Sequence, residues 1–313
     1  MRMVTAAEVE AALEDSKLIE RLRAAFREGC AMPVRTHHTV KVPGAPDATL
    51  LFMPAWQEGR HIGVKLVTVF PGNAAKGKPS VEGIYVLLDG CSGRVLALMD
   101  APTLTVRRTA CASALAASYL AREHAARLLM VGTGALAPHL VHAHSTVRPI
   151  REVTIWGRHP EKAEALAKRL ARPGLAVRAS GDLAAEVPQA DVISCATMTT
   201  EPLIRGRWLV AGQHLDLVGG YTPAMREADD EAVRRARVFV DTRAGAAKEA
   251  GDIVQPLQNG TLAEAGIEGD LYELCRGERP GRHADDEITF FKSVGAALED
   301  LAGAELVLER VGA

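Results

Sequence analysis

The spacing of apolar positions changes along the chain, from a helical start to a run of strands. Residues 6–27 repeat apolar positions at helical spacing, preceded by Thr5 as a candidate N-cap, with Glu8 three residues later as in a capping box. Between residues 36 and 102 the apolar residues gather in short runs bounded by Gly, Pro and Asp, which predicts β-strands. An alanine-rich stretch over residues 101–125 then predicts one long helix.

From residue 127 onward, segments typical of strands and of helices alternate. That alternation predicts a parallel sheet covered by helices on both faces. The tail, residues 291–311, has an amphipathic pattern and is predicted to be helical. We therefore expect an α/β fold in which a central domain is flanked by N- and C-terminal segments that together form a second domain. The predicted strands cover residues 127–131, 153–156, 177–179, 191–196, 214–218 and 237–241.

The composition sets bounds on the class of protein. At 313 residues the chain is long enough for two domains, each with its own hydrophobic core. A hydrophobic content of 48% and a charged content of 24% are ordinary for a globular protein. A formal net charge of -2, without a basic run, argues against nucleic acid or a membrane surface as a partner. We also expect no membrane span and no signal peptide, because the apolar runs are short.

Cysteine and histidine usage argues against a metal site. The five cysteines are dispersed and contain no C-x-x-C pair, which favours a reducing, cytoplasmic setting and no structural zinc. His139, His142 and His144 lie close in sequence, but on a helix His144 turns away from His139, and no carboxylate completes a ligand set. We predict a surface histidine cluster and no metal. The absence of a G-x-S-x-G motif weakens a hydrolase interpretation.

The segment 127–139 joins an apolar strand, a glycine turn and a helix. Gly132, Gly134 and Ala137 fit the pattern G-x-G-x-x-A, the phosphate-binding turn of dinucleotide folds. The first glycine permits the tight turn, the second lets the backbone approach a pyrophosphate, and the alanine lets the helix pack on the strand. The helix N-terminus then offers N–H groups to the phosphates. Such turns also occur as purely structural features, but the strand before and the helix after favour a nucleotide cofactor.

A second strand, residues 152–157, ends at Arg158 and His159. Arg158 lies 21 residues after Ala137 (158 − 137), close to the offset of about 20 expected for the residue that contacts the cofactor ribose. An acid there would bind the ribose hydroxyls of NAD, whereas an arginine accommodates the 2′-phosphate of NADP. Residues 157–159 hold no acid, so we predict NADPH as the preferred cofactor and NADH as the alternative. The competing interpretation is a solvent-facing arginine in a loop.

Three cations in the N-terminal part of the chain are candidates for binding an anion. Lys65 lies in the otherwise apolar run 63–70, where it must either reach water or meet an anion, because an isolated buried ammonium is costly. Arg108 and its neighbour Arg107 begin the alanine-rich helix, and the sequence alone does not choose between them. Arg35 is a further arginine in the same half of the chain. Together these residues suggest a small carboxylate substrate.

An ordered set of motifs across nearly the whole chain resembles the ornithine cyclodeaminase/mu-crystallin family. The resemblance implies a Rossmann domain over residues 116–289 beside a discontinuous α+β domain, residues 1–115 and 290–313, for substrate binding and dimerisation. It also implies a homodimer whose sheet extends across the two copies. The matching segments are residues 63–65 with 71–73, 104–110, 131–134, 217–223 with 226–227, 270–274 with 277, and 289–295.

The resemblance also assigns roles to individual residues. It implies that Arg35, Lys65 and Arg108 surround the substrate carboxylate, which favours Arg108 over Arg107. Lys65 and Arg108 are the predicted catalytic residues. The predicted cofactor-binding residues are Gly132, Thr133, Gly134, Ala135, Leu136, Arg158, His159, Thr197, Val218 and Gly219.

Two departures from the family pattern suggest the subtype. Cyclodeaminases carry acids where this chain has Leu51 and Tyr221, and neither residue supplies a carboxylate for the chemistry of an amino group. Residues 218–230 instead resemble the family's ketimine reductases, which reduce Δ1-pyrroline-2-carboxylate and Δ1-piperideine-2-carboxylate to L-proline and L-pipecolate. Residues 156–158 resemble their NADPH-using members.

We therefore expect an NAD(P)H-dependent reductase of small cyclic imino acids. Two alternatives use the same scaffold: an ornithine cyclodeaminase, which would recycle its bound NAD, and an alanine dehydrogenase. A third belongs to another class, a non-catalytic NADPH-binding protein like mu-crystallin. Net consumption of NADPH with an imino acid separates the reductase from the cyclodeaminase and from the binding protein.

Overall fold

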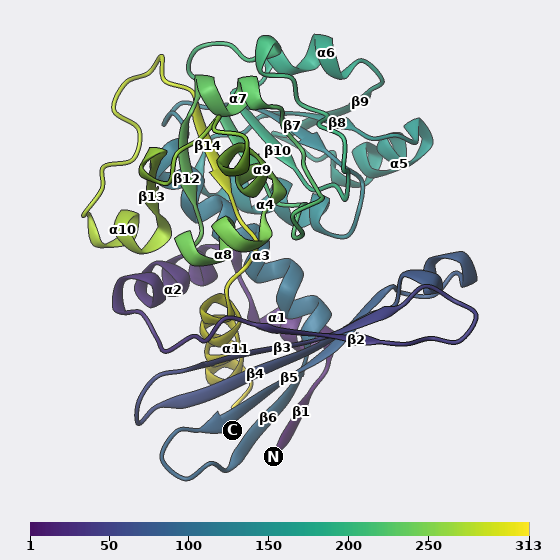
Figure 1. Ribbon diagram of the computed structural model, residues 1–313, viewed down its shortest axis with the longest axis vertical. Helices are drawn as coiled ribbons and strands as arrows, with labels where there is room; N and C mark the ends of the chain where they lie inside the picture. The colour runs from purple at the N-terminus through teal and green to yellow at the C-terminus, as the bar shows by residue number, and fades with distance from the viewer. Residues whose placement is uncertain (313) are drawn as a thin grey trace. The chain divides into compact units, whose positions relative to one another are not determined.

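The computed structural model describes residues 1–312, which form two compact units with one sheet each (Figure 1). Residues 1–108 and the segment from residue 296 onward make up the first unit, and residues 109–295 make up the second. The upstream boundary falls inside helix α3 (Ala101–Leu120). The expected α/β class, with a Rossmann-type domain and a discontinuous second domain, is confirmed.

The first unit is built on a six-stranded sheet of order β1-β6-β5-β4-β3-β2. All neighbours are antiparallel except β1 and β6, which run parallel. Lys65, in the central strand β4, pairs with Met53 of β3 on one side and Tyr85 of β5 on the other. The strands are β1 Arg2–Val4, β2 Thr36–Val40, β3 Ala48–Trp56, β4 His61–Val69, β5 Val81–Asp89 and β6 Val95–Asp100; a 3-10 turn, η1, covers Pro71–Lys76.

Helix α11 (Ala297–Val311) packs along β3, β4 and β5 of this sheet, and α1 (Ala6–Ala12) and α2 (Asp15–Glu28) pack against α11. The capping box predicted at the start of α1 is confirmed, because Thr5 and Glu8 exchange their hydrogen bonds. The prediction of a single helix over residues 6–27 is wrong, because the structure has two helices there, α1 and α2. Residues 13 and 14 have non-helical backbone angles, and the chain turns there while Leu13 stays buried.

The second unit is built on an eight-stranded sheet of order β13-β12-β14-β11-β10-β7-β8-β9, in which every pairing is parallel. The carboxyl ends of all eight strands therefore meet at one edge. β7 has β8 on one side and β10 on the other, so the strand order reverses there, which is where doubly wound folds bind ligands. The strands are β7 Arg127–Val131, β8 Glu152–Trp156, β9 Ala176–Ser180, β10 Val192–Cys195, β11 His214–Leu217, β12 Arg237–Val240, β13 Ile267–Asp270 and β14 Thr289–Lys292.

Helices and short 3-10 turns connect these strands, and side chains from both pack into a continuous hydrophobic core. Ala137 of α4 is fully buried against this sheet, as the glycine-turn motif predicts. The helices are α4 Leu136–Val147, α5 Pro160–Leu170, α6 Leu183–Glu186, α7 Asp230–Arg235, α8 Arg243–Glu249, α9 Gly251–Gln258 and α10 Leu271–Arg276; the 3-10 turns are η2 Val187–Gln189, η3 Gly206–Trp208 and η4 Glu264–Gly266.

Three predictions from the sequence are wrong here. The tail is not helical from residue 291, because Thr289–Lys292 forms β14 in the middle of the eight-stranded sheet, with all four residues buried. Helix α3 ends at Leu120 rather than at residue 125. His144 does not lie in a surface cluster: it is fully buried, and its Nε2 lies 3.1 Å from Asp216 Oδ2. Within residues 1–312, no helix combines the length and apolar character that a membrane span requires.

Candidate cofactor and carboxylate sites

The turn after β7 requires glycine at its first position. Gly132 has a φ of 122°, which L-residues with a side chain rarely adopt. A Cβ placed on it would lie 2.7 Å from the carbonyl oxygen of Ala196, in the loop after β10. Gly132 N–H donates to the carbonyl oxygen of Trp156 over 2.8 Å, which ties the turn to the end of β8. Protein packing therefore explains this glycine without any ligand.

Gly134 is different, because packing within the protein does not require it. The residue is exposed, and a Cβ built on it would meet no atom within 4 Å. Ala135, also exposed, precedes α4 with no side-chain cap on the helix N-terminus. Open space beside glycine backbone and an uncapped helix N-terminus together make a favourable place for an anion. Thr133 and Leu136, the other predicted residues of this turn, are half-buried.

The remaining predicted cofactor residues lie beyond the carboxyl ends of neighbouring strands. Arg158 and His159 follow β8 and are both exposed. Thr197 follows β10, and Val218 and Gly219 follow β11. Since β8, β7, β10 and β11 are consecutive in the parallel sheet, the structure brings all these positions to the same edge as the glycine turn.

The three predicted cations of the first unit include a buried pair. Lys65 is 2% exposed, and its Nζ lies 2.8 Å from Asp300 Oδ2 in α11. Arg108 is 4% exposed; its Nε donates to Asp300 Oδ1 over 2.9 Å, and its Nη1 donates to Glu299 Oε2 over 2.6 Å. Two cations thus meet two carboxylates, so this buried cluster is formally neutral. Burial of charges requires such pairing.

The charges in this cluster shift one another's pKa values. Burial lowers the pKa of Lys65 to about 8; Asp300 opposes the change, while the charges of Arg108 and Arg35 add to it. Burial would lower the pKa of Arg108 as well, but Asp300 and Glu299 outweigh it and raise that pKa. Arg108 therefore remains charged, whereas the pKa of Lys65 is closer to neutral pH than that of an ordinary lysine.

Arg35 and Arg107 lie differently. Arg35 is half-buried, with its Nη1 3.9 Å from Met53 Sδ, and its charge reaches Lys65. Arg107 forms ion pairs with Glu10 and Asp15 and donates to the carbonyl oxygen of Leu13. The two adjacent arginines thus diverge: Arg107 ties down the start of the chain, and Arg108 joins Lys65.

Sequence reasoning missed the acids that hold these cations. Glu299 and Asp300 are both 0% exposed, although they lie in the first turn of α11 among mostly apolar residues. An amphipathic pattern normally assigns acids to the solvent side of a helix. Their burial depends on Lys65 and Arg108, which lie far away in the sequence, so no local pattern signals it.

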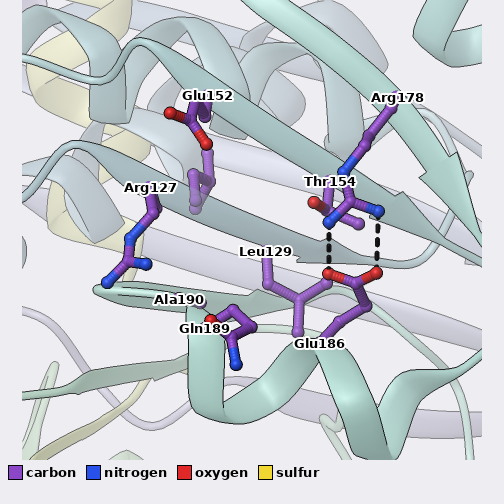
Figure 2. A pocket seen from close by; sticks show the side chains of 9 residues that line it. Arg127, Leu129, Glu152, Thr154, Arg178, Glu186, Gln189 and Ala190 are labelled. Atoms are coloured by element: carbon purple, nitrogen blue, oxygen red, sulfur yellow. Dashed lines mark hydrogen bonds and ion pairs between the residues drawn. The ribbon is translucent and has the colours of Figure 1, made fainter.

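One pocket of the second unit lies away from the glycine turn. It has a volume of about 160 Å³ and lies near the amino ends of β7 and β8 (Figure 2). Figure 2 shows Arg178 directed toward Glu186, with which it shares two hydrogen bonds of 2.7 and 2.5 Å. Arg127, which begins β7, lies on the same pocket. The charged side chains of this pocket are largely paired, and the pocket lies at the opposite edge of the sheet from the glycine turn. We therefore do not assign this pocket to the cofactor. Among residues 1–312, no group of three or more His, Cys, Asp or Glu side chains could hold a metal ion.

Comparison with known proteins places this geometry in a family. The sequence profile of the Ornithine cyclodeaminase/mu-crystallin family matches residues 1–313. The chain belongs to this family. It is 41% identical over 278 residues to a Delta(1)-pyrroline-2-carboxylate reductase of Paracoccus denitrificans, covering 88% of each chain.

Two solved structures of about the same length share the fold. A Delta(1)-pyrroline-2-carboxylate reductase from Thermococcus litoralis, in complex with NADH and L-proline, is 32% identical, with a TM-score of 0.94 over 99% of this chain and 97% of that one. An archaeal alanine dehydrogenase dimer with bound NAD is 27% identical, with a TM-score of 0.90 over 99% of this chain and 96% of that one.

Replacing Arg108 should destabilise the protein more than replacing its neighbour. Arg108→Met leaves Glu299 and Asp300 buried with one cation between them, so we expect a loss of about 3–5 kcal/mol in the free energy of unfolding. Arg107→Met removes partly exposed ion pairs and one carbonyl contact, for which we expect about 1–2 kcal/mol. Chemical denaturation of both variants measures the difference, and equal losses would contradict the charge balance described above.

Proposed function

We propose that this protein is an NAD(P)H-dependent reductase of cyclic ketimine carboxylates, converting Δ1-pyrroline-2-carboxylate to L-proline and Δ1-piperideine-2-carboxylate to L-pipecolate. The observation that carries the proposal is the likeness, over 99% of the chain, to a reductase solved with NADH and L-proline. L-Proline is the product of the first of these reactions. The Paracoccus relative, which carries the same reductase name, adds to this support.

In this proposal the first unit binds the substrate through Arg35, Lys65 and Arg108. The ion pairs of these three residues differ. Lys65 and Arg108 are balanced by Glu299 and Asp300 in the buried cluster, whereas Arg35 lies half-buried and its charge reaches Lys65. Lys65 and Arg108 then provide directional, charge-assisted donors on rigid elements, β4 and α3. Held in this way, the substrate presents its C=N carbon in one orientation.

The second unit holds the nicotinamide dinucleotide. The turn from Gly132 to Ala135 and the N-terminus of α4 would take the pyrophosphate, and Thr197, Val218 and Gly219 would line the cofactor further along the same sheet edge. When bound, the reduced cofactor would supply a hydride to the imine carbon; the proton on the amine nitrogen would come with the substrate as its iminium form, or from water or a nearby group. Uncapped backbone N–H groups and open space at Gly134 support this assignment.

The residues at the two departures from the cyclodeaminase pattern favour reduction. Leu51, in β3, pairs with Val67, two positions along the strands from the pair that Met53 forms with Lys65 and so on the same face of the sheet. Tyr221 follows the Gly219–Gly220 turn and is half-buried. Neither side chain offers a carboxylate to a reacting amine. A preformed imine needs no such group, because only hydride delivery remains.

We further propose NADPH as the preferred cofactor. Arg158 is exposed just beyond β8, where the 2′-substituent of the adenosine ribose lies in dinucleotide folds. His159 beside it is also exposed, with its Nδ1 3.5 Å from Glu161. No acid stands at residues 157–159 to bind a free 2′-hydroxyl.

We also propose that two copies pair through one face of the six-stranded sheet of the first unit, instead of by the extension of the sheet across both copies that the family resemblance implies. One face of this sheet carries Gly63, Lys65 and Tyr85, which face α11. Alternation along the strands turns the other face outward. That face is apolar and half-buried, and apolar patches of this kind mark surfaces where proteins associate. Its residues include Phe52, Pro54, Ile62, Val64, Leu66, Ile84, Val86 and Leu98.

The reductase proposal is tested by assaying both imine reduction and the release of ammonia from ornithine. With Δ1-pyrroline-2-carboxylate or Δ1-piperideine-2-carboxylate, we expect NADPH to be consumed and L-proline or L-pipecolate to form. With L-ornithine and NAD we expect no meaningful release of ammonia, because Leu51 and Tyr221 cannot replace the missing acids. Ammonia release from ornithine faster than imine reduction would restore the cyclodeaminase. Dinucleotide binding without turnover of any imino acid would indicate a binding protein.

Lys65→Met should cripple imine reduction while leaving cofactor binding nearly intact. It removes a buried, charge-assisted contact, so we expect kcat/KM to fall by the equivalent of about 1.5–3 kcal/mol. Steady-state kinetics measures kcat/KM, and titration of NADPH fluorescence measures cofactor affinity. A kcat/KM within a factor of two of the parent would remove Lys65 from the site.

Arg158→Asp should weaken the use of NADPH far more than the use of NADH. The 2′-phosphate loses a cation and meets a like charge, whereas the 2′-hydroxyl gains an acceptor. The measurement is kcat/KM with each cofactor for both proteins. If the ratio of NADPH to NADH use does not fall, Arg158 is a loop residue without a role in selectivity.

Light scattering should give twice the chain mass of 33.4 kDa for the wild type. Leu66→Lys places a charge in the proposed interface and should shift the protein to a single chain. Val81→Lys is the matched control, because Val81 lies in the same sheet but is 50% exposed. A wild-type protein of single-chain mass at micromolar concentration would contradict the pairing.

A further inference from the structure

A buried carboxylate holds together two of the loops at the carboxyl edge of the eight-stranded sheet. Glu227 is 0% exposed. Its Oε1 accepts hydrogen bonds from the backbone N–H and the hydroxyl of Thr197, each over 2.7 Å. Its Oε2 accepts from the backbone N–H of Gly219 over 2.8 Å. One side chain thus collects three donors from the loops after β10 and β11.

These two loops approach each other at the limit of close packing. A Cβ on Gly219 would lie 1.9 Å from the carbonyl oxygen of Thr197 and 2.2 Å from its nitrogen. Backbone therefore lies directly against backbone, and no side chain fits between. Glu227 accepts hydrogen bonds from both loops at this point of close approach, so its carboxylate links them.

Two further buried groups fix Glu227 itself. Asp252, in α9, accepts the backbone N–H groups of Glu227 and Ala228 over 2.8 and 3.0 Å. Lys292, at the carboxyl end of β14, places its Nζ 3.2 Å from Asp252 and 3.9 Å from Glu227. All three charged side chains are 0% exposed. When both acids are ionised, one lysine faces two carboxylates, and the backbone N–H groups that Glu227 and Asp252 accept stabilise the remaining negative charge.

We propose that Glu227 is a positioning residue for the dinucleotide: its carboxylate sets the spacing of the loops that present Thr197 and Gly219 to the cofactor. This inference rests on the proposed function, which assigns those two residues to the cofactor. Asp252 and Lys292 act one step further away, by holding the backbone and the charge of Glu227. A buried acid can also accept backbone N–H groups in the second unit without contacting these two loops. Asp191, for example, accepts the N–H groups of Ala126 and Arg127 at the amino edge of the sheet, each over 2.9 Å.

Opposing effects act on the pKa of the Glu227 carboxyl group. Burial raises the pKa of Glu227 to about 7; Lys292 opposes this shift, and the nearby charge of Asp252 adds to it. Each hydrogen bond from Thr197 lowers the pKa, since it stabilises the ionised acid. The loops and the carboxylate therefore stabilise each other.

Glu227→Gln tests the inference. Glutamine keeps one accepting oxygen but turns an NH₂ group toward a second donor, so one loop is released. We expect the dissociation constant for NADPH, measured by fluorescence titration of the full-length protein, to rise about tenfold. At saturating NADPH we expect the KM for Δ1-pyrroline-2-carboxylate to change less than twofold, because the carboxylate cations lie in the other unit.

Asp191→Asn is the matched control. It makes the same chemical change to a buried acid that accepts two backbone N–H groups, but at the opposite edge of the same sheet. We expect a comparable fall in thermal stability and an unchanged dissociation constant for NADPH. If both variants weaken NADPH binding equally, Glu227 has only a general structural role, and the inference is overturned.

Glu227→Asp keeps the proposal testable if the glutamine variant fails to fold. It retains the charge beside Lys292 but shortens the reach to the loops, so NADPH binding should still weaken. Affinity within twofold of the wild type in a folded Glu227 variant overturns the positioning role while leaving the reductase proposal intact. A wild-type protein that binds no dinucleotide overturns the proposed function, and this inference with it.

Discussion

The need to pair every buried charge shapes both candidate sites of this protein. Lys65 and Arg108 lie in the interior of the first unit only because Glu299 and Asp300 come from α11 to meet them. Lys292 is buried at the carboxyl end of β14, an interior strand of the eight-stranded sheet, only because Asp252 and Glu227 face it. In each unit, helix or loop residues distant in sequence neutralise a cation on a strand or helix. Removing one partner leaves the others in a medium that solvates charge poorly.

The two clusters differ in what the pairing leaves over. In the first unit two cations meet two acids, so the buried pair contributes N–H donors rather than net charge. In the second unit one lysine meets two acids, and the excess negative charge is taken up by N–H groups of Thr197 and Gly219. The first arrangement suits recognition of an anion. The second suits the fixing of backbone.

The glycines of the turn after β7 separate demands of the fold from demands of a ligand. Gly132 is required by its backbone angle and by the carbonyl group of Ala196. Gly134 meets no neighbour within 4 Å, so the fold alone would accept alanine there. In a chain that belongs to a family of dinucleotide-type folds, such an unexplained glycine points to something outside the protein.

The sequence by itself determined the features that depend on neighbouring residues. The capping box of Thr5 and Glu8, the glycine turn after β7 and the alternation of strands and helices follow from local spacing, and the structure contains each of them. Motifs in the right order were enough to indicate the family. Local patterns carry such information because the backbone preferences they express act within a few residues.

Only the tertiary structure decided which distant residues meet. Arg107 and Arg108 are chemically equal in the sequence, and their partners lie 92 (107 − 15) to 192 residues away along the chain. Residues 291 and 292 looked like the start of an amphipathic tail, yet they belong to β14, an interior strand of a parallel sheet whose four residues are all buried. Burial of His144, Glu227 and Asp300 followed the same rule. A polar residue is stable in the interior once a partner reaches it, and the identity of that partner is set by the packing of elements that local spacing does not encode.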